Sequence, residues 1–225
     1  MLKAFINIFR VSELRQKVFF TLMIFAVYRL GAHIPTPGVD GRALAQFFEM
    51  IGQQQGGNLF GIMNLFTGGA MSQMTIFALG IMPYISASII IQLLTVVIPA
   101  LERLSKEGDE GRKKIIQYTR YGTVGLSIIQ SFFISLWLEN PAAFQGITIV
   151  SDPGWGFRIL CVLTLTTGTA LIMWLGEQID EHGIGNGVSL IITIGIIAAI
   201  PQAFFQTMAL VSPLDAAKRQ ISLPI

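Results

Sequence analysis

The sequence predicts an all-α membrane protein with five transmembrane helices. Two observations carry this prediction: only 12% of the 225 residues are charged, and long stretches of the chain have no charge at all. Residues 50–101 are uncharged, as are 121–138, 159–176 and 183–214. Because soluble domains carry roughly 25% charged residues, a water-soluble enzyme or nucleic-acid-binding protein is excluded.

The apolar segments set the positions of the predicted helices. A bilayer core of about 30 Å needs about 20 apolar helical residues. The segments that meet this length are 18–35, 75–98, 119–138, 157–175 and 188–210. Pro83 lies inside the second segment and predicts a kink there, because proline removes one helical hydrogen bond.

Lys and Arg residues beside these spans predict their orientation. The N-terminal segment 1–17 holds four and residues 102–120 hold six, whereas 36–74 holds only Arg42 and 139–156 holds none. We therefore place 1–17 and the basic loop 99–118 in the cytoplasm, and 36–74, 139–156 and the tail 211–225 outside. The turn 176–187 should also be cytoplasmic, although it carries three acids and no Lys or Arg, so its own charge does not support that side.

The loop 36–74 is long enough to have structure of its own. Residues 43–51 suit a short amphipathic helix at the interface, and 59–66 are strongly apolar but too short to span. Gly68 and Gly69 then form a hinge before the second span. The pattern leaves two alternatives open: a re-entrant element, or a loop helix packed on the bundle.

Two pairs of aliphatic residues suggest a function but do not prove one. Ile81 and Ile85 lie four apart, as do Val188 and Ile192, so each pair shares a helix face. These faces could line a pore or contact lipid. The glycine-rich segment 176–187 before the second pair suits a tight loop, or the unwound helix of an inverted-repeat solute transporter.

The residues that carry most enzymatic chemistry are missing from useful positions. Cys161 is the only cysteine, and His33 and His182 have no neighbours at metal-ligand spacing. The middles of the five spans contain no ionisable residue of the kind that proton or ion coupling normally needs. We therefore expect no catalytic residues, no metal and no cofactor.

Four long motifs resemble the SecY family, which forms the channel of the bacterial protein-secretion translocon. They follow one another in the family's order: YRLGAHIPTPGVD (28–40), NLFTGGAMSQMTIFALGIMPYISASIIIQLL (64–94), LSKEGDEGRKKIIQYTRYGT (104–123) and WLGEQIDEHGIGNGVSLII (174–192). The resemblance implies a fold of ten helices in two inverted halves that close like a clamshell, with a short re-entrant plug helix. This chain corresponds to the N-terminal half, spans 1–5.

The resemblance also implies a function and a set of partners. The family's channel moves unfolded secretory polypeptides across the bacterial plasma membrane and releases membrane proteins sideways into lipid. Expected partners are the C-terminal half of the channel, the small subunits SecE and SecG, the SecA motor or the ribosome, and signal sequences. Half of an inverted-repeat solute transporter is the alternative from a different class.

The resemblance assigns roles to residues that the pattern alone left open. Residues 58–70 match the plug, including Leu59, Phe60, Ile62, Met63, Leu65, Phe66, Gly68 and Gly69. Ile81, Ile85, Val188 and Ile192 match the pore ring, and Ser86, Ile89 and Gln92 are candidate contacts at the lateral gate. A ring of branched aliphatic side chains would seal against ions, because narrow apolar constrictions dewet.

The predicted orientation is open to a direct test. A cysteine introduced by Gly108→Cys should react with a thiol reagent supplied from the cytoplasmic side, because it lies in the basic loop 99–118. Reaction from the external side alone would invert the topology.

Overall fold

A computed structural model describes residues 11–54, 64 and 66–211. Within these residues the fold confirms the all-α prediction. Within these ranges β-pairing is limited to two isolated bridges, Pro35 with Thr75 and Val39 with Val150. The helical elements are α2 (Ser12–Gly31), α3 (Gly41–Gln54), α5 (Met82–Val97), α6 (Pro99–Lys106), α7 (Asp109–Leu138), the 3-10 helix η1 (Pro141–Phe144), α8 (Trp155–His182) and α9 (Gly187–Val211).

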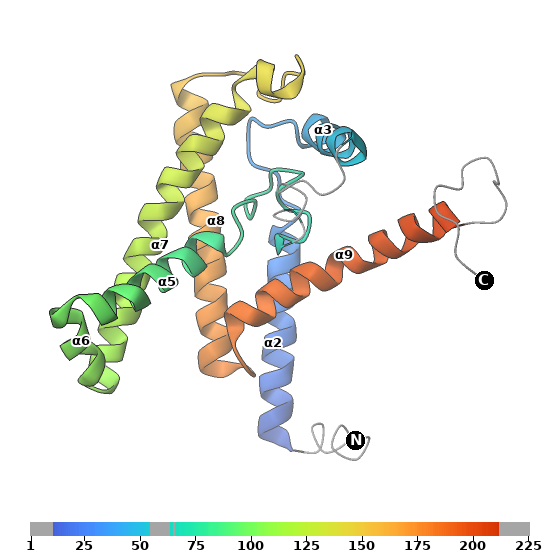
Figure 1. Cartoon of the computed structure of the whole chain (residues 1–225). Coiled ribbons are helices and arrows are strands. Elements are labelled where there is room, and N and C mark those ends of the chain that lie inside the picture. The colour runs from blue at the N-terminus through green and yellow to red at the C-terminus, as the bar shows by residue number, and fades with distance from the viewer. Residues whose placement is uncertain (1–10, 55–63, 65, 212–225) are drawn as a thin grey trace.

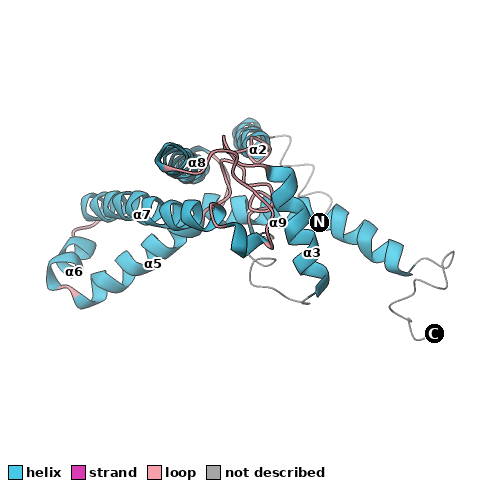
Figure 2. Cartoon of the chain, turned by 90° about the horizontal axis from the view of Figure 1, so that it is seen from above, coloured by secondary structure: helices cyan, strands magenta, loops and turns pink. Residues whose placement is uncertain are grey.

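Helix α8 occupies the middle of the arrangement. It packs against α7, α9, α2 and α5, and α5 packs in turn along α7. Seen from above in Figure 2, α5, α6 and α7 extend to one side of α8 and α2, and α9 extends to the other. The result is an open arrangement, with α9 projecting obliquely away from the other helices in Figure 1.

A buried stripe of small hydroxyl residues lets α7 pack closely. Its members recur at every fourth position, are at most 6% exposed, and are Thr119, Thr123, Ser127, Ser131 and Ser135. Each hydroxyl donates to a backbone carbonyl of α7 itself, as Thr123 does to Thr119 at 2.8 Å and Ser135 to Phe132 at 2.7 Å. Small residues of this kind allow helix backbones to approach within a membrane.

Two glycines, Gly168 of α8 and Gly187 at the start of α9, allow neighbouring backbone to contact α8. A Cβ added at Gly168 would overlap the carbonyl oxygen of Ile76, and a Cβ added at Gly187 would overlap the carbonyl oxygen of Gly176. The segment before α5 and the start of α9 therefore both lie directly on α8. No larger residue fits at these points without displacing a neighbour.

The predicted span 75–98 is not helical over its first seven residues. The chain runs through turns up to residue 81 and becomes helical only at Met82. Gly80 has φ +57°, outside the helical region, which explains why the apolar pattern does not continue as a helix. Pro83 lies in the first turn, where its missing N–H breaks no hydrogen bond, so the kink predicted there is absent.

The sharp bend lies instead at the other end of α5. Ile98 has extended backbone (φ −98°, ψ 114°) and is followed by Pro99, which disfavours a helical residue before it. The chain turns by 100° at this point into α6. The predicted loop 99–118 is thus helical almost throughout, formed by α6 and the first turns of α7.

Two further boundaries differ from the predictions. α8 continues through Glu177 to His182, so most of the predicted turn 176–187 is helix. The reason is that the buried face of α8 persists at three- to four-residue spacing through Ile172, Leu175 and Ile179. α2 ends at Gly31 rather than at residue 35, before Pro35 and Pro37. α9 begins one residue before the predicted 188–210 and ends one residue after it.

Of the described helices, α7 and α8 are long and apolar enough to cross a membrane, and the bent pair α5–α6 brings the number to at most three. α2 carries Glu13, Arg15, Lys17 and Arg29 within its 20 residues. Five spans therefore stay a prediction.

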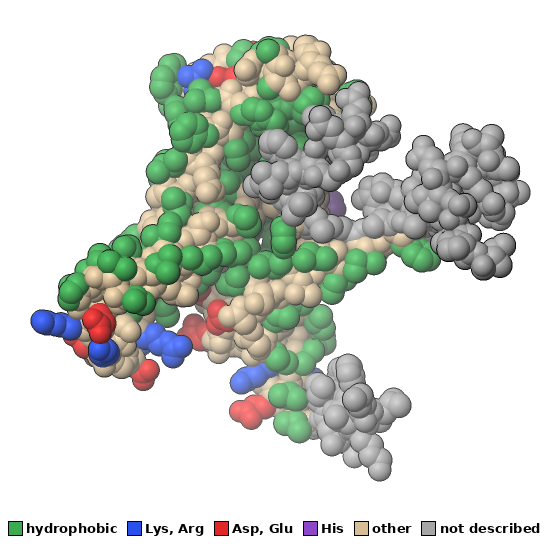
Figure 3. Space-filling model, in the orientation of Figure 1, with side chains coloured by type: hydrophobic (Ala, Val, Ile, Leu, Met, Phe, Trp, Pro, Cys, Tyr) green, Lys and Arg blue, Asp and Glu red, His purple; other side chains and the backbone are tan. Residues whose placement is uncertain are grey.

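The described parts of the two predicted basic segments lie at the same end of the molecule. The start of α2 and helix α6 occupy the lower end in Figure 1, and α3 and η1 occupy the upper end. In Figure 3 most of the visible Lys and Arg side chains gather at that lower end. This arrangement is the one that the predicted orientation requires.

Ion pairs join α7 to α8 near both ends. Arg120 Nε donates to Glu177 Oε1 at 2.7 Å, and at the upper end Arg158 Nη2 lies 2.7 Å from Glu139 Oε2. Glu139 also accepts from the backbone N–H of Gly154 at 2.9 Å, and its side chain is only 8% exposed. The hydrogen bond from Arg158 lowers the pKa of Glu139 below its usual value.

The contact of α8 with α9 predicts that Gly187→Ala destabilises the fold. The added methyl must displace the Gly176 backbone, which should cost about 1–3 kcal/mol of unfolding free energy. Gly125→Ala on α7 is the control, because a Cβ there meets nothing within 4 Å. Thermal unfolding in detergent should give a lower Tm for the first variant only; equal Tm values would contradict the close contact.

The lowered pKa of Glu139 predicts a pH-dependent effect of Glu139→Gln. Because the folded-state pKa lies below the unfolded one, the carboxylate stabilises the fold above the usual pKa, and this stabilisation is lost as pH falls through the folded value. The variant should lower Tm at pH 7 by about 2–4 °C for each kcal/mol lost. The difference from the unmodified chain should close on acidification below about pH 4.

The control for this experiment is Glu102→Gln. Its ion pair with Lys106 is of the i,i+4 kind, with both side chains largely exposed, and such pairs contribute little. A Tm difference for Glu139→Gln that stays constant from pH 7 to about pH 3 would contradict the prediction.

Candidate functional site

The predicted pore-ring residues of the first pair lie where α5 begins. Ile81 is the residue immediately before α5, and Ile85 lies in its first turn. The backbone N–H of Ile85 donates to the carbonyl of Ile81 at 3.1 Å, so the two residues are one helical turn apart although only Ile85 is within the helix.

The second pair lies where α9 begins, in a turn held by two polar side chains. Asn186 Oδ1 accepts from the N–H of Ser189 at 2.9 Å, which is a helix N-cap. Asp180 Oδ1, near the end of α8, accepts from the N–H of Gly187 at 2.7 Å. These bonds fix the first turn of α9, which carries Val188 and leads to Ile192.

The structure brings all four predicted pore-ring residues into one apolar cluster, which we call the aliphatic cluster. Ile81 is one of its buried members, and Ile85, Val188 and Ile192 pack against it partly buried. Its buried members are Ile24, Tyr28, Ala32, Ala70, Phe77, Ile81, Ile172, Leu175, Ile179 and Ile191.

The last part of the predicted plug is a hydrogen-bonded turn. The N–H of Gly69 donates to the carbonyl of Asn64 at 2.9 Å, and the N–H of Ser72 donates to Asn64 Oδ1 at 2.9 Å. Gly68 and Gly69 have φ +64° and +89°, a conformation that glycine adopts without strain. Of the other predicted plug residues, Phe66 is described, and Leu59, Phe60, Ile62, Met63 and Leu65 lie outside the described residues.

The candidate lateral-gate residues lie along α5. Ser86 is half-buried, Ile89 is 51% exposed, and Gln92 is exposed. Gln92 Nε2 donates to Ser88 Oγ of the same helix at 3.1 Å. α5 packs along α7, where a Cβ added at Gly122 would lie 3.5 Å from the Cβ of Ala87, so the two helices are in close contact there.

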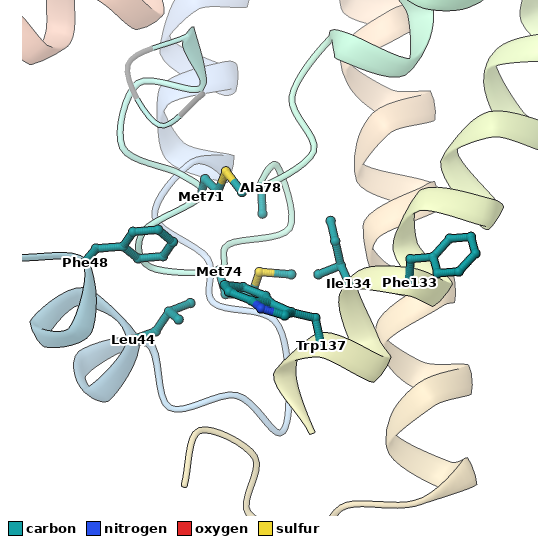
Figure 4. A pocket seen from close by; sticks show the side chains of 8 residues that line it. All are labelled: Leu44, Phe48, Met71, Met74, Ala78, Phe133, Ile134 and Trp137. Atoms are coloured by element: carbon teal, nitrogen blue, oxygen red, sulfur yellow. The ribbon is translucent and has the colours of Figure 1, made fainter. Parts of the chain in front are cut away.

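An apolar pocket lies away from the aliphatic cluster, between α3, the segment 71–78 and α7. Its volume is about 250 Å³. Figure 4 shows the side chains that line it and the elements from which they come. They are apolar or aromatic: Leu44, Phe48, Met71, Met74, Ala78, Phe133, Ile134 and Trp137.

Possible metal ligands do not come together in the part of the chain that the structure describes. No group there contains three or more His, Cys, Asp or Glu side chains able to hold an ion. Cys161 is fully buried in a second apolar cluster with Leu165 and Phe157. His33 Nδ1 lies 2.8 Å from the carbonyl oxygen of Arg29, one turn earlier in the chain.

Sequence reasoning missed the contributions of α2 and α8 to the site. Ile172, Leu175 and Ile179 are almost fully buried in the aliphatic cluster, and their spacing along α8 was the signal that could have identified them. Arg29 also reaches the site: its Nη1 donates to the carbonyl oxygen of Gly68 at 3.3 Å. No periodicity signals that contact, which joins residues 39 positions apart.

Comparison with known proteins identifies the family of the chain. The model of the SecY family matches residues 75–223. The chain is 52% identical to the protein translocase subunit SecY of Buchnera aphidicola, over 88% of this chain and 54% of that protein. It is 51% identical to SecY of Escherichia coli K12, over 88% of this chain and 43% of that protein.

A solved structure described as that of a protein-conducting channel shares the fold. It superposes with a TM-score of 0.60 at 16% identity, over 89% of this chain and 43% of that one. The chain therefore spans about half the length of the relatives and the structure that it matches. The family match over most of the chain shows that it belongs to the SecY family.

Proposed function

We propose that this chain forms the N-terminal half of a protein-conducting channel in the bacterial plasma membrane, with its N-terminus in the cytoplasm. The channel passes unfolded secretory polypeptides across the membrane and releases hydrophobic segments sideways into lipid. The relatives are named protein translocase subunits, which favours this function over that of a solute transporter and gives no indication of an enzyme.

One observation carries the proposal: the aliphatic cluster gathers uncharged, branched side chains from two separate helix starts. Ile81 and Ile85 come from α5, and Val188 and Ile192 come from α9. A channel for arbitrary polypeptides cannot depend on specific polar contacts, and aliphatic side chains can part and close again around any residue. In the resting channel the same side chains form an apolar constriction that excludes ions.

The remaining assignments follow from this role. Residues 58–70 act as the plug of the external funnel, with Gly68 and Gly69 as its hinge. Ser86, Ile89 and Gln92 contribute to the lateral gate on α5. The C-terminal half of the channel completes the pore, SecE and SecG bind around it, and SecA or the ribosome supplies the driving energy.

The seal is tested by the double variant Ile81→Gly and Ile85→Gly in a full-length channel that contains this N-terminal half. Removing two branched side chains widens and wets the constriction, so the resting ion conductance in a planar bilayer should rise at least several-fold. The matched control is Ile90→Gly with Val96→Gly, since both of these side chains lie on exposed parts of α5. If the two double variants conducted equally, the seal would not lie at Ile81 and Ile85.

A further inference from the structure

Arg29 is a cation in an unusual place. It lies in the last turn of α2 and is half-buried. In Figure 1 that end of α2 lies well below α3 and the upper ends of α7 and α8, so the turn is inside the height of the bundle. A half-buried charge among packed helices is costly unless it is paired or hydrogen-bonded. The ion pairs found between described residues do not include Arg29.

The partner of Arg29 is the backbone of the turn Phe66–Ala70. Arg29 Nη1 donates to the carbonyl oxygen of Gly68 at 3.3 Å. A hydrogen bond to a backbone carbonyl needs no particular side chain at residue 68, but it does need the turn to keep its position. The guanidinium thus holds this turn from the side of α2.

Helix α9 contacts the same turn at Gly195. A Cβ added at Gly68 would lie 3.0 Å from Gly195 Cα, and a Cβ added at Gly195 would lie 3.1 Å from the carbonyl oxygen of Phe66. The backbone of the turn therefore packs directly against the backbone of α9. Glycine at both positions is what allows this approach.

The turn behaves as one unit and covers the aliphatic cluster. Its bonds join Asn64 to Thr67, Gly69 and Ser72, with Thr67 Oγ1 donating to the Asn64 carbonyl at 3.1 Å. Ala70 is 1% exposed and belongs to the aliphatic cluster together with Ile81 and Ile191. Displacing the turn would expose Ala70 and remove one layer above the proposed constriction.

We propose that Arg29 and Gly195 form a clasp that holds the turn Phe66–Ala70 against the aliphatic cluster in the closed channel. This inference rests on the proposed channel function and adds to it two positioning residues outside the pore ring. Because one side of the clasp is the backbone of α9, movement of α9 away from α2 withdraws Gly195 and leaves the hydrogen bond from Arg29 as the remaining part of the clasp. The position of α9 thereby controls release of the turn.

The test uses two clasp variants, Arg29→Gln and Gly195→Ala, in the full-length channel. The first removes the cation, and the second inserts a methyl against the Phe66 carbonyl. Ala70→Cys is added to each as a reporter, read by its reaction with a charged thiol reagent; the native Cys161 is fully buried. Resting ion conductance is measured on the same variants without the reporter.

Two matched controls separate the clasp from general effects. Arg15→Gln removes the same charge from the exposed start of the same helix, and Gly125→Ala adds a methyl where nothing lies within 4 Å.

Both clasp variants should speed labelling of Ala70→Cys by about tenfold and raise resting conductance, because charged hydrogen bonds and close packing each contribute measurably. The controls should change neither. Arg29→Lys, which keeps the charge but not the guanidinium, should fall between them.

The outcomes are distinguishable from failure of the proposed function. If the Ile81→Gly, Ile85→Gly channel leaks while both clasp variants label and conduct like the unmodified channel, the clasp is wrong and the channel proposal stands. If the clasp variants lower Tm without changing labelling, Arg29 and Gly195 are merely structural and the proposal is overturned. If neither set leaks, the proposed seal fails and the clasp fails with it.

Discussion

The rest of the structure depends on the close approach of other backbone segments to α8. At Gly168 the segment leading into α5 lies directly against the helix, and at Gly176 the start of α9 does the same. In a membrane the hydrophobic effect between helices is largely absent, and packing of small residues takes its place. Without these two contacts neither helix start would be held at a fixed position relative to the other.

The candidate site follows from that constraint. Ile81 and Val188 each lie within a few residues of a contact with α8, so α8 brings the two pairs of aliphatic side chains together. The same helix adds its own Ile172, Leu175 and Ile179 to the cluster. The turn that covers the cluster is held from α2 and α9. Helix α9 therefore contributes both to the proposed seal, through Val188 and Ile192, and to its cover, through Gly195.

Hydropathy predicted the apolar helices well and their ends poorly. α9 was placed within a residue, because Asn186 and Gly187 give a clear start signal before a long apolar run. Residues 109–118 and 177–182 were assigned to loops although they are helical. Hydropathy indicates whether a segment suits lipid or water, and it does not report the backbone conformation. Residues 75–81 show the opposite error: they are apolar, yet the positive φ of Gly80 keeps them out of the helix.

Sequence reasoning also found only part of the candidate pore site. The spacing of Ile81 with Ile85 and of Val188 with Ile192 was visible, and the family resemblance supplied their role. The contact of Arg29 with Gly68 was not visible, because nothing periodic links two residues separated by a long loop.

The hydroxyl stripe of α7 has a mechanical consequence. Each of its five hydroxyls is satisfied within α7, so sliding of a neighbouring helix along the stripe breaks none of those hydrogen bonds. Toward α8 such sliding is opposed by the ion pairs Arg120–Glu177 and Arg158–Glu139 near the two ends of the contact. Toward α5 the contact includes the small residues Ala87 and Gly122. α7 and α8 are thus held together by ion pairs at two separate points, whereas the described contact of α7 with α5 includes two small residues that packing alone holds together.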